Sequence, residues 1–130
     1  MKAIIYKIGN KTLYLAYNGE AMFAIEELHG GIKELPEKLN NKDRESFKST
    51  CEVAALLAEQ GELVRRYYGH EPQDIIAADD LRSIIQPSQI AEMTDAIFRS
   101  IALGYGSEID RGKDDEIDLV LMELNQKKTN

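Results

Sequence analysis

The most reactive side chains in this sequence are His29, His70 and Cys51. His29 lies beside a pair of glycines, and His70 lies in a Gly-His-Glu-Pro segment that is typical of a turn. Neither histidine is separated from Cys51 by a spacing found in metal sites or in local nucleophile motifs. An enzyme would need these groups, or carboxylates, to converge in one cleft. We therefore expect no enzymatic activity, no catalytic residues and no cofactor.

Acidic residues gather between residues 108 and 118, and calcium binding is the first chemistry that they suggest. An EF-hand loop needs oxygen ligands at fixed positions and a glycine at the sixth. Counted from Asp110, Gly112 occupies the third position and no glycine occupies the sixth. We expect a solvated, charged linker here and no metal site.

The charge of the chain argues against nucleic acid as a partner. Its net charge is −7, whereas proteins that bind DNA or RNA use clustered Lys and Arg to displace counterions from phosphates. Two helices around Gln86-Pro87-Ser88 resemble a helix-turn-helix, but the second, residues 89–103, has only Arg99 as a basic residue. A small helix-turn-helix regulator is therefore an alternative that would require a positive recognition face.

The composition is typical of a soluble globular protein. The 130 residues suit one domain, and 43% apolar with 30% charged residues is far from the composition of disordered chains. The beginning of the sequence lacks the apolar core of a signal peptide, and no apolar run approaches the ~20 residues that span a membrane. One cysteine cannot form an internal disulfide. We expect a cytoplasmic protein that does not interact with a membrane.

Period-two alternation of apolar residues over 3–17, around Gly9-Asn10, predicts an N-terminal β-hairpin. Asn18 can cap a helix over 19–29 that ends at Gly30-Gly31. Residues 32–42 contain Pro36 and are expected to form a connector with at most one loose helical turn.

Helical spacing resumes at Asp43 and predicts a central helix to about Gln60, which could continue past Gly61 as far as Gly69. On the outer face of this helix Lys48 and Glu52 are expected to pair. Shorter helices are predicted over 79–85 and 89–103. The expected fold is mainly α, with the hairpin packed on a small bundle of three to four helices.

The C-terminal part has a different character, and we expect a domain over 1–106 followed by a linker and amphipathic segment over 107–130. Ile117, Val120, Leu121 and Leu124 recur at helical spacing. A helix tethered in this way has an apolar face that needs cover from its own domain, from a partner or from a second copy. These four residues are candidates for protein binding.

Tyr67 and Tyr68 form a second candidate binding site. They follow Arg65-Arg66 at the predicted end of the central helix, and Tyr and Arg are enriched at the energetic centres of protein interfaces. The alternative is that both tyrosines simply close the core at a helix end.

The segments Tyr14–Gly31, Val53–Leu57, Asp79–Pro87 and 90–104 carry a resemblance to a known family. Over about residues 3–106 the order of features resembles the phage tail assembly chaperones of tailed phages and prophages of Gram-positive bacteria. The resemblance implies a small acidic helical protein that coats the long, apolar tape measure protein and helps to recruit tail tube protein. Some members also have a longer product made by ribosomal frameshifting. A structural head or tail component of the phage particle is the nearest alternative.

Overall fold

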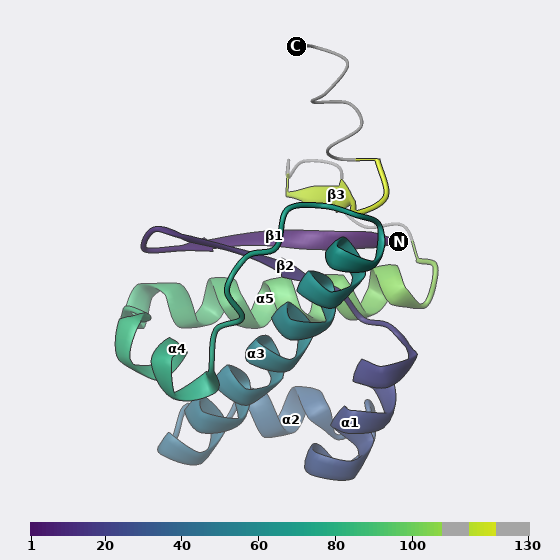
Figure 1. Ribbon diagram of the computed structural model, residues 1–130. Helices are drawn as coiled ribbons and strands as arrows, with labels where there is room; N and C mark the ends of the chain where they lie inside the picture. The colour runs from purple at the N-terminus through teal and green to yellow at the C-terminus, as the bar shows by residue number, and fades with distance from the viewer. Residues whose placement is uncertain (108–114, 122–130) are drawn as a thin grey trace.

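The computed structural model describes residues 1–107 and 115–121 (Figure 1). The described residues are 57% helical and form three strands and five helices, in the order β1, β2, α1, α2, α3, α4, α5 and β3. The expectation of a helix-rich chain with an N-terminal hairpin is confirmed. The hairpin is, however, part of a three-stranded antiparallel sheet with the strand order β2-β1-β3.

The hairpin joins β1 (Lys2–Ile8) to β2 (Lys11–Leu15), with Ile4 opposite Leu15 and Ile8 opposite Lys11. Gly9 has a φ of 57°, a left-handed value that favours glycine in a two-residue turn. Alternate residues of each strand are buried because successive side chains point to opposite faces of the sheet.

The central element is α3 (Arg44–Tyr67), which runs without interruption through Gly61. Its N-cap is Asp43, whose carboxylate accepts a hydrogen bond from the Ser46 amide at 2.8 Å. The face that enters the core carries a run of small and aliphatic side chains, namely Val53, Ala54, Leu57 and Ala58. The helix therefore extends well beyond Gln60, as the wider of the two sequence predictions allowed.

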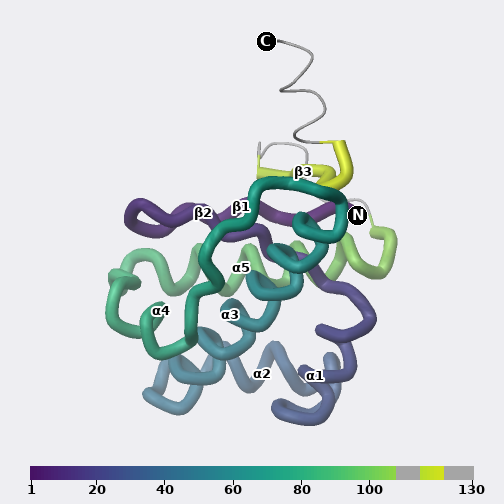
Figure 2. Tube along the Cα trace, viewed as in Figure 1, coloured from purple at the N-terminus to yellow at the C-terminus, as the bar shows by residue number. Residues whose placement is uncertain are grey.

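The other helices surround α3. They are α1 (Gly19–His29), α2 (Leu35–Leu39), α4 (Ala78–Ile84) and α5 (Pro87–Gly104). Asn18 caps α1 as predicted, accepting a hydrogen bond from the Ala21 amide at 2.9 Å. The sheet lies on α5 and α3, with α5 packed on β1 and α3 on β2, and the three shorter helices lie on the far side (Figures 1 and 2).

The third strand, β3 (Glu116–Asp118), lies where helical spacing around Ile117 had predicted part of the amphipathic C-terminal segment. It pairs antiparallel with β1, with Ala3 opposite Ile117. Backbone hydrogen bonds from Ile5 N to Asp115 O (2.7 Å) and from Leu119 N to Met1 O (2.8 Å) flank the strand. The free edge of β1 offers unpaired backbone groups, and pairing with them outweighs the helical spacing of the side chains.

Candidate protein-binding surfaces

The reactive side chains lie on different sides of α3. Cys51 is fully buried, and burial raises the pKa of its thiol to about 11, although the nearby Arg82 of α4 acts in the opposite direction. A thiol with such a pKa is a poor nucleophile at neutral pH. His29 instead contacts Glu52, one residue further along and therefore about 100° further round the helix. His70 lies beyond the end of α3, where its ring contacts the backbone of Leu119.

The sequence spacing predicted that Glu52 pairs with Lys48. In the structure Glu52 pairs with His29 instead. His29 Nε2 lies 3.5 Å from Glu52 Oε2, and the imidazole is almost completely buried at the end of α1. Burial, together with the positive charge of Lys38, lowers the pKa of His29, while Glu52 acts in the opposite direction. Burial dominates, so the neutral imidazole is the form that suits this site.

Tyr67 and Tyr68, one of the two predicted binding sites, project into solvent from the end of α3. Tyr67 is 82% exposed and Tyr68 is 47% exposed, so the alternative that they close the core does not describe this structure. Their rings form an edge-to-face pair with centroids 5.1 Å apart. Leu63, one turn earlier on α3, is also exposed. Together Leu63, Tyr67 and Tyr68 form a surface that we call the tyrosine surface.

A buried ionic network holds the backbone beneath the tyrosine surface. Glu62 binds the guanidinium groups of Arg65 and Arg66, at 2.5 and 2.9 Å, and accepts a hydrogen bond from the Gln73 amide at 2.8 Å. Arg65 is fully buried, lies 4.9 Å from the centre of the Tyr14 ring, and donates to the Glu71 carbonyl oxygen. These contacts fix the chain where it leaves α3, so the tyrosines stand on a rigid support.

The residues of the other predicted binding site, in the C-terminal segment, have different environments. Ile117 and Val120 are half-buried, and Leu121 is 49% exposed. Leu124 lies outside the described residues. Leu119, which was not among the predicted residues, is fully buried in a small cluster with Ala3 and Ala16. The alternation of Ile117 and Leu119 is the signal that would have indicated a strand.

The fold brings the two predicted sites to the same end of the molecule. His70, two residues after Tyr68, donates from Nε2 to the Leu119 carbonyl oxygen at 2.5 Å. Val64 of α3 packs against the cluster around Leu119. In Figure 1 the end of α3, the chain that follows it, and β3 lie close to one another. The tyrosine surface and the segment 115–121 are thus neighbouring parts of one structure.

A third surface, which the sequence analysis did not single out, is centred on Phe47. An apolar hollow of about 620 Å³ lies between α2, the first turns of α3, and the beginning of α5, with Leu39, Phe47, Pro87, Ile90 and Ala91 in its lining. The remaining lining residues are Asn40, Lys42, Asp43, Ser46, Thr50 and Thr94.

Three hydroxyl groups that line this hollow are engaged by nearby carbonyl groups. Ser46 Oγ donates to Lys38 O at 2.6 Å, Thr50 Oγ1 to Ser46 O at 2.8 Å, and Thr94 Oγ1 to Ile90 O at 2.9 Å. A hydroxyl group that already donates its proton to a carbonyl oxygen does not need a hydrogen-bond acceptor on a ligand. The walls are therefore more apolar than their residue types suggest.

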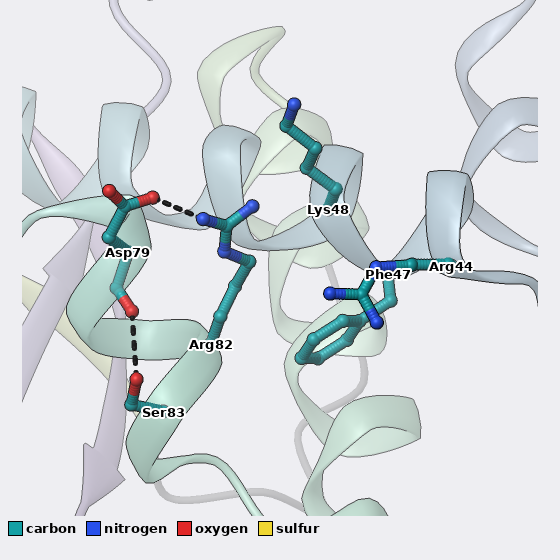
Figure 3. Close-up of a pocket in the computed structure, with 6 residues that line it drawn as sticks. All are labelled: Arg44, Phe47, Lys48, Asp79, Arg82 and Ser83. Carbon is teal, nitrogen blue, oxygen red and sulfur yellow. Dashed lines mark hydrogen bonds and ion pairs between the residues drawn. The ribbon is translucent and has the colours of Figure 1, made fainter.

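A cationic hollow of about 550 Å³ adjoins the apolar one, because Phe47 lines both. Figure 3 shows Arg44 and Lys48 extending from α3, opposite Asp79, Arg82 and Ser83 of α4. Arg82 is paired with Asp79, whereas Arg44 and Lys48 have no ion-pair partner among the described residues. Three cations and one carboxylate leave an excess of two positive charges. We call the two hollows together the Phe47 groove.

Sequence reasoning missed the groove because its parts come from distant segments. Leu39 lies in the predicted connector, whereas Phe47 and Ile90 lie in two separate predicted helices, and no local spacing connects the three residues. The expected ion pair between Lys48 and Glu52 implied that the Lys48 charge was already neutralised. A group of cations in a chain of net charge −7 is the one signal that could have directed attention to this region.

Among the described residues, no group of three or more His, Cys, Asp or Glu side chains could hold a metal ion, and no helix is long and apolar enough to cross a membrane. A scan against protein-family models, a search of curated proteins and a search of solved structures each found no match for this chain.

Proposed function

We propose that this chain is a protein-binding assembly factor, specifically a tail assembly chaperone of a phage or prophage. It binds the tape measure protein in the host cytoplasm and helps to recruit tail tube subunits. The tyrosine surface is the part of the molecule that contacts this partner.

The observation that carries the proposal is the exposure of Tyr67 and Tyr68 on a rigid support. Leaving large aromatic side chains in water forgoes the favourable free energy of burying them, and Tyr is typical of interface hot spots. The network around Glu62 holds the backbone in place before binding, so little conformational entropy is lost when a partner docks.

The partner implied by this surface is an apolar or amphipathic helical segment. Two aromatic rings and Leu63 supply apolar contact area, and the hydroxyl groups at the tips of the tyrosines can bind polar groups at its rim. A long protein with exposed apolar faces would aggregate without such cover, and the net charge of −7 would keep the covered complex dispersed.

The test is a binding measurement between this chain and a tape measure protein from the same genome, using co-expression followed by calorimetry on the purified proteins. Tyr67→Ser combined with Tyr68→Ser should raise the Kd by about 30-fold, because hot-spot residues contribute about 2 kcal/mol or more. Both side chains are exposed, so the thermal unfolding of the variant should match that of the wild type.

Ile84→Ser is the matched control, because Ile84 is 44% exposed and belongs to α4, which lies away from the end of α3 (Figure 1). It should leave the Kd unchanged. Equal binding by the tyrosine variant and the wild type would contradict the proposed surface. Recovery of this chain in purified phage particles would indicate a structural head or tail component in place of an assembly factor.

A further inference from the structure

The outer face of α1 complements the Phe47 groove in apolar character and in charge. Phe23 is 58% exposed, and the exposed Glu20, Glu26 and Glu27 surround it on the same side of the helix. The groove has the opposite character, with apolar walls and an excess of positive charge. One surface thus offers an aromatic ring among carboxylates, and the other offers an apolar hollow beside unpaired cations.

A single molecule cannot bring these two surfaces together. α1 is held against the side of α3 that carries Glu52 and Gln60, through His29 and Asn18 respectively. The groove lies along a different side of α3, which carries Phe47 and faces α4 and α5. In Figure 1 α1 and the beginning of α5 lie on opposite sides of the molecule. The complementary face must therefore come from another molecule.

We propose that the outer face of α1 in one copy of this chain docks into the Phe47 groove of a second copy. Phe23 enters the apolar hollow, while Glu20 and Glu27 face Arg44 and Lys48. The two surfaces differ, so the contact is heterologous and leaves one groove and one α1 face free at the ends. Further copies can then add in a row. This contact does not depend on the identity of the partner proposed above.

The carboxylates around Phe23 are the reason to infer that a second copy of this chain occupies the groove. The other exposed aromatic residues among the described part of the chain are Tyr67, Tyr68 and Tyr105. The first two follow Arg65 and Arg66, and Tyr105 lies between glycines. Phe23 is the exposed ring in the described residues that shares one helix face with three exposed carboxylates, which suit Arg44 and Lys48. Identical copies with a charge of −7 repel each other overall, so this local attraction has to act at short range.

Charge reversal tests the contact directly, with sedimentation velocity at up to about 200 μM protein and low salt. The groove variant is Arg44→Glu with Lys48→Glu, and the helix variant is Glu20→Lys with Glu27→Lys. The wild type should self-associate, and each variant alone should do so at least about tenfold more weakly because like charges face each other. An equimolar mixture should recover the association, since each variant then meets a partner of opposite charge.

Lys7→Glu with Lys11→Glu is the matched control for the groove variant. It changes the net charge by the same amount, but on exposed lysines of the hairpin. This control and the tyrosine variant should both self-associate as the wild type does. All four reversed side chains are exposed, and recovery in the mixture itself requires that both variants are folded. A monomeric wild type, undiminished association of either variant, or a mixture that stays dissociated would overturn the proposal.

Discussion

At the scale of single residues, Gly61 determines how closely α3 can approach the sheet. A Cβ atom at this position would collide with the backbone carbonyl oxygen of Tyr14 on β2. The Ala16 amide donates to the Leu57 carbonyl oxygen of the same helix at 3.2 Å, which shows that the two backbones are in direct contact. Glycine is therefore required here by space and not by a break in the helix.

Gly61→Ala is expected to lower the free energy of unfolding by about 3 kcal/mol or more, because a backbone atom cannot move aside as a side chain can. Gly19→Ala is the control. Nothing lies near a Cβ at Gly19, so alanine there should be neutral or stabilise the protein by up to about 1 kcal/mol. Chemical denaturation of both variants measures the difference. A Gly61→Ala protein as stable as the wild type would rule out the close approach.

His29 gives the stability of the protein a dependence on pH. Its pKa in the folded protein is lowered, mainly by burial, so the folded state binds fewer protons than the unfolded state near pH 6. The contribution of the neutral imidazole is complete above the unfolded pKa of about 6.5 and is lost as the pH falls through the lower, folded pKa.

His29→Gln should therefore lose less stability than the wild type when the pH is lowered from about 7.5 to about 5.5. The measurement is the free energy of unfolding at several pH values, taken as the difference between variant and wild type so that the carboxylates cancel. A wild type that becomes more stable than the variant on acidification would mean that the ion pair with Glu52, and not burial, controls this histidine.

At the scale of elements, β3 joins the C-terminal part to the sheet by several independent contacts. Arg99 of α5 binds both carboxylate oxygens of Asp115, at 2.5 and 2.7 Å. Lys2 pairs with Glu116 at 3.0 Å, and the His70 ring binds the Leu119 carbonyl group. Bidentate Arg–carboxylate contacts are among the stronger polar interactions in proteins. Residues 115–119 are thus held on the sheet and do not form a separate docking segment.

Leu119→Ala is expected to cost about 2 to 5 kcal/mol of stability, because its fully buried side chain would leave a cavity beneath the strand. Leu121→Ala should change stability by no more than about 0.5 kcal/mol, since that side chain is 49% exposed. Urea denaturation of the two variants provides the comparison. Equal, negligible effects would restore the expectation that the entire segment is independent of the domain.

At the scale of the whole molecule, the fold places the tyrosine surface and the Phe47 groove at opposite ends of α3. The tyrosines lie at its last turn, and Arg44 and Phe47 lie at its first. A molecule that binds a long partner at one end and a neighbouring copy at the other could cover that partner by successive addition of copies. Each weak contact would then raise the effective concentration for the next one. The variants described above separate these two roles, because each alters only one end.

Features that depend on near neighbours in the chain could be predicted from the sequence. The alternation around Gly9-Asn10 predicted the hairpin, the side chain of Asn18 predicted where α1 begins, and the helical spacing from Asp43 predicted where α3 begins. These signals act within a few residues, where strand pleating and helix capping are governed by local geometry.

Features that depend on distant partners became visible only in the folded structure. Residues 116–118 form a strand because the edge of β1, more than a hundred residues earlier, is free to pair with them. Gly61 remains within a helix because its lack of a side chain allows contact with Tyr14. The Phe47 groove exists only where α2, α3, α4 and α5 meet. In each case the outcome depends on packing between segments far apart in the chain, and a local pattern such as the alternation of Ile117 and Leu119 does not identify the distant partner.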